Sequence, residues 1–173
     1  MNTNNIILIG MPGAGKSTIG VVLAKKLGYT FIDSDLVIQE KEHMLLHEII
    51  SQKGLDGFNE VENKINAQLD VSHSIIATGG SVVYGKEAMQ HLSSIGTIIY
   101  LCLPFDDLVK RLGDLEERGV SMRPEQTLLD LYRERTPLYE KYADITINCS
   151  DISIREIVGL IAKKLNKQTQ SNR

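Results

Sequence analysis

The chain of 173 residues contains 42% hydrophobic and 24% charged residues, which suits one soluble globular domain with a sizeable core. Its net charge of −3 argues against a dedicated nucleic-acid-binding protein, because such proteins normally carry a basic face. The sequence shows neither a run near the ~20 apolar residues of a membrane-spanning helix nor the basic start of a secretory signal. We therefore expect a cytoplasmic monomer without nucleic-acid or membrane partners, with reduced thiols at Cys102 and Cys149.

The first motif directly follows the first predicted strand. Residues 5–9 form a short, apolar, β-branched run that is typical of a buried strand. Residues 10–17 then match G-x-x-x-x-G-K-[ST]. Apolar residues at helical spacing predict a helix from Ser17 to Leu27, which Gly28 ends as a C-terminal glycine would. This strand–loop–helix context predicts a phosphate-binding loop.

Each residue type in the loop has a physical role. The glycines allow a tight turn and a close approach of backbone N–H groups to phosphate oxygens, and the helix N-terminus adds its positive dipole end. We expect Lys16 to reach the β- and γ-phosphates and the Ser17 hydroxyl to bind Mg²⁺. The sequence therefore predicts Mg·ATP binding by Gly10, Gly13, Ala14, Gly15, Lys16, Ser17 and Thr18.

Two carboxylates follow the second predicted strand, which covers residues 29–32. Asp33 and Asp35 alternate with Ser34, so a continued strand would direct both carboxylates to one side. One carboxylate could hold the waters of Mg²⁺, while the other accepts a proton or hydrogen bond from an acceptor hydroxyl. The alternative is that Asp35 caps the next helix, and the two roles are compatible.

The remaining chain alternates between helices and strands. Helices are predicted over 36–42, 45–53, 58–69, 86–92, 105–112, 128–142 and 152–165, and strands over 74–78, 97–103 and 144–148. This order predicts a three-layer α/β fold, with a five-stranded parallel sheet covered by helices on both faces. We expect a single P-loop kinase domain over residues 1–165 and a flexible tail over 166–173. Ligands should bind at the carboxyl ends of the strands, where Gly79 and Gly80 follow the third.

A charged segment with little periodicity, residues 113–124, predicts a mobile lid. Arg111, Arg118 and Arg123 lie in or beside it, and lid closure could bring an arginine to the phosphates of ATP. A P-loop so early in a short chain suggests a small kinase. The histidines show no arrangement typical of a zinc protease, so we interpret them as structural or surface residues.

In their order and spacing, several motifs together resemble the shikimate kinase family over nearly the whole chain. They are Gly13-Ala14-Gly15-Lys16-Ser17-Thr18, Phe31-Ile32-Asp33-Ser34-Asp35, Gly57-Phe58-x-x-x-Glu62, Ala77-Thr78-Gly79-Gly80, and Glu134-Arg135-Thr136-Pro137-Leu138-Tyr139 before Ala143-Asp144. The resemblance implies the nucleoside-monophosphate-kinase type of fold with a closing lid. It also implies ATP-dependent phosphorylation of shikimate to shikimate 3-phosphate, a step of aromatic amino-acid biosynthesis.

The resemblance also implies roles for individual residues. Asp35 would hold the acceptor hydroxyls, Asp33 would support Mg²⁺, and Arg111 would stack on adenine. The acceptor would be bound by Asp35, Asn59, Gly79, the Gly80 backbone and Arg135, which would take its carboxylate. The expected catalytic residues are Lys16, Asp35 and Arg118. Arg118 aligns with the lid arginine of the family with fewer gaps than Arg123 does. Arg123-Pro124, however, has the Arg-Pro dipeptide that is familiar from the lid of the family.

Two positions depart from the family pattern. Asn59 replaces an arginine expected to pair with the shikimate carboxylate, which could weaken binding by roughly 2–5 kcal/mol if the carboxylate were buried and unpaired. Ser81 replaces the third glycine of a Gly-Gly-Gly run. Three interpretations follow: a shikimate kinase that tolerates Asn59, a related kinase for another small hydroxylated metabolite, or a non-catalytic nucleotide-binding regulator. The retained Lys16 and Asp35 disfavour the third.

Overall fold

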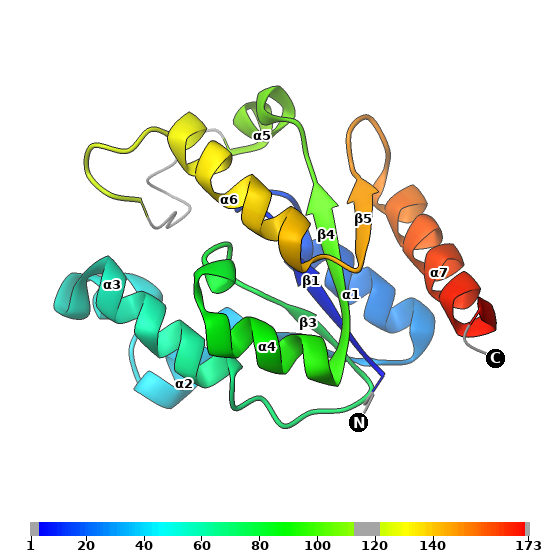
Figure 1. The fold of residues 1–173 in the computed structure, drawn as a ribbon, viewed down its shortest axis with the longest axis horizontal. Coiled ribbons are helices and arrows are strands. Elements are labelled where there is room, and N and C mark those ends of the chain that lie inside the picture. Colours follow the sequence, from blue (N-terminus) through cyan, green and yellow to red (C-terminus); the bar gives the residue numbers. More distant parts are fainter. Residues whose placement is uncertain (1–3, 113–121, 172–173) are drawn as a thin grey trace.

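The computed structural model describes residues 4–112 and 122–171 and has the predicted α/β architecture (Figure 1). A parallel sheet has the strand order β2-β3-β1-β4-β5. Its strands are β1 (Asn5–Ile9), β2 (Thr30–Asp33), β3 (Ser74–Ala77), β4 (Gly96–Cys102) and β5 (Ile145–Asn148). The prediction of a five-stranded parallel sheet is thus confirmed.

Helices cover both faces of this sheet. They are α1 (Lys16–Leu27), α2 (Ser34–Glu42), α3 (Leu46–Asn66), α4 (Lys86–Ile95), α5 (Phe105–Leu112), α6 (Leu128–Tyr142) and α7 (Ile154–Ser171), with a short 3₁₀ helix at Val82–Tyr84. In Figure 1, α4 and α6 lie in front of the sheet and α1 lies behind it. Within the described ranges, no helix combines the length and apolar character needed to cross a membrane.

The central strand β1 forms the middle of the core. All five of its residues are buried, and Ile7 lies opposite Ile76 of β3 and Ile98 of β4. Asn5 is the polar exception, at 2% exposure. Its side-chain amide donates to Val71 O at 2.8 Å and to Ile95 O at 3.1 Å, and its Oδ1 accepts from Ser74 N at 3.0 Å. A satisfied buried amide therefore ties the start of β3 and the end of α4 to the start of β1.

Helix α3 (Leu46–Asn66) consists of two helical segments that meet in a bend at Gly54, in agreement with the prediction of separate helices over 45–53 and 58–69. Gly54 has a φ of 71° and a ψ of 177°, which lie outside the helical region and which glycine adopts without the penalty of a Cβ. The second segment begins directly after Gly54 and not at residue 58. The bend lets α3 form a second apolar cluster with α2 that includes Ile38, Ile49, Phe58 and Ile65.

The C-terminal boundary was also predicted wrongly. Helix α7 continues to Ser171, whereas we expected it to end at Leu165 before a flexible tail over 166–173. Residues 166–171 contain no glycine or proline, and lysine and glutamine are good helix formers. The polar composition of this segment therefore did not mark the end of the helix. Helix α6 has the predicted bounds and includes Pro137.

Close packing at the start of β4 leads to a stability prediction. A Cβ added at Gly96 would lie 2.4 Å from Asn5 O and 2.7 Å from Ile7 Cδ1, whereas one added at Gly159 in α7 meets no described atom within 4 Å. We expect Gly96→Ala to lower the free energy of unfolding by about 1–3 kcal/mol through overpacking. Gly159→Ala should raise it by about 0.5–1 kcal/mol, since alanine favours helix. Urea unfolding followed by circular dichroism measures both, and equal effects would contradict the packing argument.

Candidate active site

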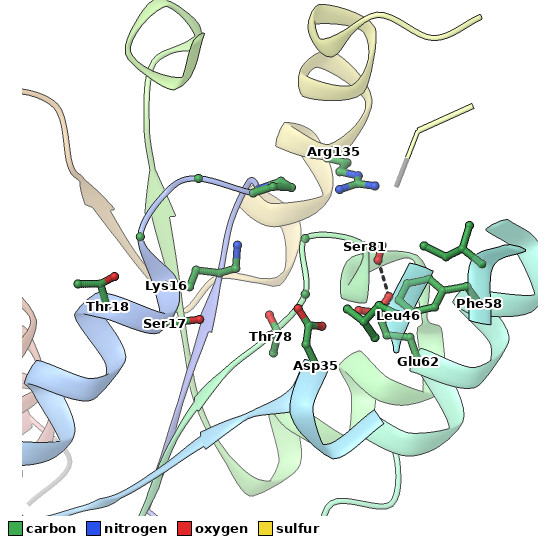
Figure 2. A pocket seen from close by; sticks show the side chains of 16 residues that line it. Lys16, Ser17, Thr18, Asp35, Leu46, Phe58, Glu62, Thr78, Ser81 and Arg135 are labelled. Atoms are coloured by element: carbon green, nitrogen blue, oxygen red, sulfur yellow. Dashed lines mark hydrogen bonds between the residues drawn. The ribbon is translucent and has the colours of Figure 1, made fainter. Parts of the chain in front are cut away.

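A cavity of about 280 Å³ lies beyond the carboxyl ends of the central strands (Figure 2). The P-loop forms one side, and Asp35 projects into it from the start of α2. Leu46, Ile50 and Phe58 of α3 supply an apolar wall. The loop after β3 and Arg135 of α6 complete the lining. As predicted, parallel strands bring polar residues from distant parts of the sequence to one edge of the sheet.

The P-loop has the backbone geometry of a phosphate cradle. Gly10 and Gly15 have φ values of 148° and 95°, which residues with a Cβ rarely adopt. A Cβ at Gly10 would also lie 2.8 Å from Leu101 O. Lys16 is 8% exposed, and its Nζ donates to Gly10 O at 2.7 Å and Met11 O at 2.9 Å. The loop therefore holds a buried cation beside the N-terminus of α1, where a phosphate would bind.

Asp33 organises the boundary between β2 and α2. Its Oδ1 accepts from Asp35 N at 3.0 Å and so caps α2, while its Oδ2 accepts from Ser17 Oγ at 2.9 Å. Our expectation of a continued strand through Asp35 was wrong, as was Asp35 as the cap, because the helix already begins at Ser34. A hydroxyl and a carboxylate oxygen lie together beside the P-loop, and Mg²⁺ prefers such ligands. Ser17 and Asp33 therefore fit a magnesium ion.

Asp35 lies half-buried in the first turn of α2 and lines the cavity. Burial raises the pKa of its carboxyl, and the charge of Asp33 raises it further, while Lys16 counteracts both. A carboxylate with a raised pKa is a better proton acceptor than an exposed one. Asp35 can thus both orient a hydroxyl and take its proton.

Arg135 supplies a cation on the opposite side of the cavity. It is 2% exposed, its Nε donates to Tyr84 OH at 3.3 Å, and its guanidinium lies 5.3 Å from the centre of the Tyr84 ring. Gly80 lies so close that an added Cβ would be 2.9 Å from Arg135 Nη1. The carbonyl of Gly80 is held by Tyr139 OH at 2.6 Å. These residues form a rigid, positively charged corner suited to a carboxylate.

Glu62 and Ser81 are site residues that sequence reasoning did not single out as functional. Glu62 is 1% exposed and lines the cavity, and its Oε2 accepts from Ser81 Oγ at 2.6 Å. Burial raises the pKa of Glu62 to about 7, although the Ser81 hydrogen bond lowers it. A signal was present, because Glu62 lies four residues after Phe58 and three before Ile65, on the buried face of α3.

A second cavity, of about 490 Å³, adjoins the P-loop on the side of α7. Arg111 contributes to its lining together with Thr18, Ile154 and Ile157. The guanidinium of Arg111 donates to Cys149 O at 3.3 Å, which directs it toward the loop before α7. An apolar cavity with a planar cation beside the phosphate loop suits a purine base.

Asn59 and Arg123 both line a third cavity, of about 260 Å³. Tyr84 and Glu134 also line this cavity, and it shares Arg135 with the main cavity. Arg123 thus lines the same cavity as Asn59, and its predicted contact with ATP stays a prediction. Arg118 and most of the predicted lid lie outside the described residues. Within those residues, no group of three or more histidine, cysteine, aspartate or glutamate side chains could hold a metal ion.

The parallel sheet, the P-loop with its buried lysine and the adjoining carboxylate-lined cavity define a P-loop phosphotransferase. A shikimate kinase family model matches residues 12–166. The chain is 39% identical to a shikimate kinase of Haemophilus influenzae over 91% of this chain and 92% of that protein. It is 35% identical to that of Vibrio parahaemolyticus over 95% and 97%. The chain therefore belongs to the shikimate kinase family.

Solved structures agree with this assignment. A shikimate kinase from Acinetobacter baumannii in complex with shikimate superposes with a TM-score of 0.86 at 31% identity, covering 95% of this chain and 94% of that one. That from Aquifex aeolicus gives 0.80 at 30% identity, covering 95% and 98%. The activity is shikimate kinase activity, a phosphotransfer in aromatic amino-acid biosynthesis that uses ATP.

The burial of Lys16 predicts a pH dependence. Burial lowers the pKa of its ammonium to about 8, and the charge of Asp35 opposes this shift. Lys16 is therefore charged below pH 8 and loses its proton as the pH rises through that value. We expect the KM for ATP to rise above about pH 8, by at most about tenfold per pH unit. Initial rates at varied ATP concentration measure this, with the exposed Lys41→Ala variant as control. A constant KM up to about pH 9.5 would contradict the prediction.

Proposed function

We propose that this chain transfers the γ-phosphoryl group of ATP to the 3-hydroxyl of shikimate, with Mg²⁺ held by Ser17 and Asp33. The observation that carries the proposal is the shared cavity of Lys16, Asp35 and Arg135. It joins a phosphate-binding cation, a proton acceptor and a carboxylate-binding cation. These are the groups that phosphoryl transfer to a hydroxy acid requires.

ATP would bind along the P-loop with its phosphates at the N-terminus of α1. The proposal places the adenine in the second cavity, against Arg111, and the γ-phosphate at the main cavity beside Lys16. Bound Mg²⁺ would neutralise phosphate charge and orient the transferred group. The backbone N–H groups of Gly13, Ala14 and Gly15 would add hydrogen bonds to phosphate oxygens.

The acceptor would lie between Asp35 and Arg135. Arg135 binds its carboxylate, and the apolar wall with Phe58 packs against its ring. Asp35 orients the reacting hydroxyl and takes its proton as the oxygen attacks phosphorus. Lys16 stabilises the charge that develops on the transferred phosphoryl group. Closure of the lid would exclude water and so complete the site. We retain Arg118 as the proposed lid arginine, with Arg123 as the alternative.

A second candidate acceptor follows from Asn59. The neutral amide of Asn59 in the third cavity cannot form an ion pair with a carboxylate, so the alternative acceptor is another small hydroxylated metabolite. The free thiols of Cys102 and Cys149 support a cytoplasmic location. The monomeric state stays a prediction.

Replacing Asp35 tests the proposed chemistry. Asp35→Asn keeps the shape of the side chain and can orient a hydroxyl, but an amide cannot take its proton. We expect kcat with shikimate to fall at least about 100-fold while the KM for ATP changes less than about twofold. A coupled assay of ADP release measures both constants, with exposed Asp70→Asn as the matched control. Retained turnover in Asp35→Asn would refute the role of Asp35 as proton acceptor.

Position 59 tests the identity of the acceptor. If shikimate binds with its carboxylate at Arg135, Asn59→Arg should supply a second cation and lower the KM for shikimate about tenfold. Asn59→Gln lengthens the side chain without charge and should have little effect. A raised KM would favour an acceptor without a carboxylate there, because the new arginine would be unpaired. Unchanged kinetics would mean that position 59 does not face the acceptor.

A further inference from the structure

Tyr84 contacts the cation that the proposed function assigns to the carboxylate of the acceptor. Arg135 Nε donates to Tyr84 OH at 3.3 Å, and the guanidinium carbon lies 5.3 Å from the centre of the Tyr84 ring. Arg135 lines both the main and the third cavity, whereas Tyr84 lines the third cavity and not the main one. Tyr84 therefore does not border the space proposed for the acceptor, and it can act on the acceptor only through Arg135.

A second partner fixes the direction of the Tyr84 hydroxyl. The hydroxyl donates to Oε1 of Glu134, and Gln126 Nε2 donates to Oε2 of the same carboxylate at 3.2 Å. A carboxylate only accepts hydrogen bonds and Arg135 Nε only donates them, so the hydroxyl gives its proton to Glu134 and offers a lone pair to Arg135. Burial and the hydrogen bond to Glu134 raise the pKa of Tyr84, while Arg135 opposes them, so the phenol keeps its proton at neutral pH.

Packing holds both Tyr84 and Arg135 in place. Tyr84 ends the 3₁₀ helix, whose other two residues, Val82 and Val83, are buried. Another nitrogen of the guanidinium, Nη1, lies against the Gly80 backbone, where an added Cβ would be only 2.9 Å away. The planar guanidinium thus contacts the ring and hydroxyl of Tyr84 at Nε and closely packed backbone at Nη1, and these contacts fix its orientation.

We propose that Tyr84 is a positioning residue, which holds the guanidinium of Arg135 in the orientation that binds the carboxylate of the acceptor. This inference rests on the proposed function and adds to it a residue outside the main cavity. An arginine side chain has several rotatable bonds, and fixing them during binding lowers affinity. Contacts that already fix these bonds in the free protein therefore favour binding of the acceptor.

Removal of the hydroxyl provides the first test. Tyr84→Phe keeps the ring but loses the hydrogen bonds to Arg135 and Glu134, so we expect the KM for shikimate to rise about fivefold. The turnover number kcat and the KM for ATP should stay within about twofold of the wild type, because Tyr84 lines neither the main nor the second cavity. Tyr29→Phe is the matched control. Tyr29 stacks on His73 at the amino end of β2, and its variant should leave every constant unchanged.

Removal of the ring separates a positioning role from a purely structural one. Tyr84→Leu loses the hydroxyl and the contact between ring and cation, so the KM for shikimate should rise further, to at least about tenfold above the wild type. Thermal unfolding of each variant measures stability separately. A lower unfolding temperature with an unchanged KM for shikimate would show a structural role only and would overturn the inference.

An acceptor without the carboxylate shows whether Tyr84 acts through Arg135. Shikimate whose carboxylate is replaced by a neutral carboxamide cannot form the charge-assisted pair with the guanidinium. Measured as kcat/KM below saturation, Tyr84→Phe should cost about fivefold with shikimate and less than about twofold with the carboxamide. Equal losses with the two acceptors would contradict the inference, because Tyr84 would then act on some other part of the site.

The outcomes separate this inference from the proposed function. A wild-type enzyme without shikimate-dependent ADP release would overturn both. An active wild type whose KM for shikimate is unchanged in Tyr84→Phe would overturn the inference alone, and so would a variant in which the KM for ATP rises by the same factor. A rise confined to the KM for shikimate, and absent with the carboxamide, would support it.

Discussion

The burial of one cation is the constraint on which the site depends. Lys16 is 8% exposed, and removing an ammonium group from water is unfavourable unless other groups compensate. The carbonyls of Gly10 and Met11 accept its hydrogen bonds, and the negative charges of Asp35, Asp33 and Glu62 counteract the effect of burial. The P-loop, the start of α2 and the middle of α3 are therefore linked by charge as well as by packing.

Burial shifts the pKa values of the acids in the cavity in the opposite direction from that of Lys16. Burial raises the pKa values of Asp35 and Glu62, while Lys16 opposes the shift of both and Arg135 that of Glu62. Charges of both signs thus come from four different helices, and each limits the cost of burying the others. Such a cavity is prepared for a ligand that brings a phosphate to one end and hydroxyls and a carboxylate to the other.

The two departures from the family pattern, Asn59 and Ser81, lie outside the P-loop and line two neighbouring cavities. Asn59 lines the neighbouring cavity together with Arg123. Ser81 has an ordinary backbone conformation and hydrogen-bonds to Glu62. The glycines that need close backbone approach are Gly79 and Gly80, and both are retained. Ser81 therefore adds a hydroxyl to the lining of the main cavity without an unusual backbone conformation in this loop.

The sequence by itself determined the strands, the P-loop, the end of α1 at Gly28 and the sheet edge that carries the site. These features depend on local patterns: apolar periodicity, and glycines at positions with positive φ. Only the tertiary structure decided that Asp33 caps α2 and that Glu62 pairs with Ser81. It alone placed Asn59 beside Arg123. Each of these depends on contacts between distant residues or on a choice between competing local conformations, and packing, which periodicity does not encode, selects among them.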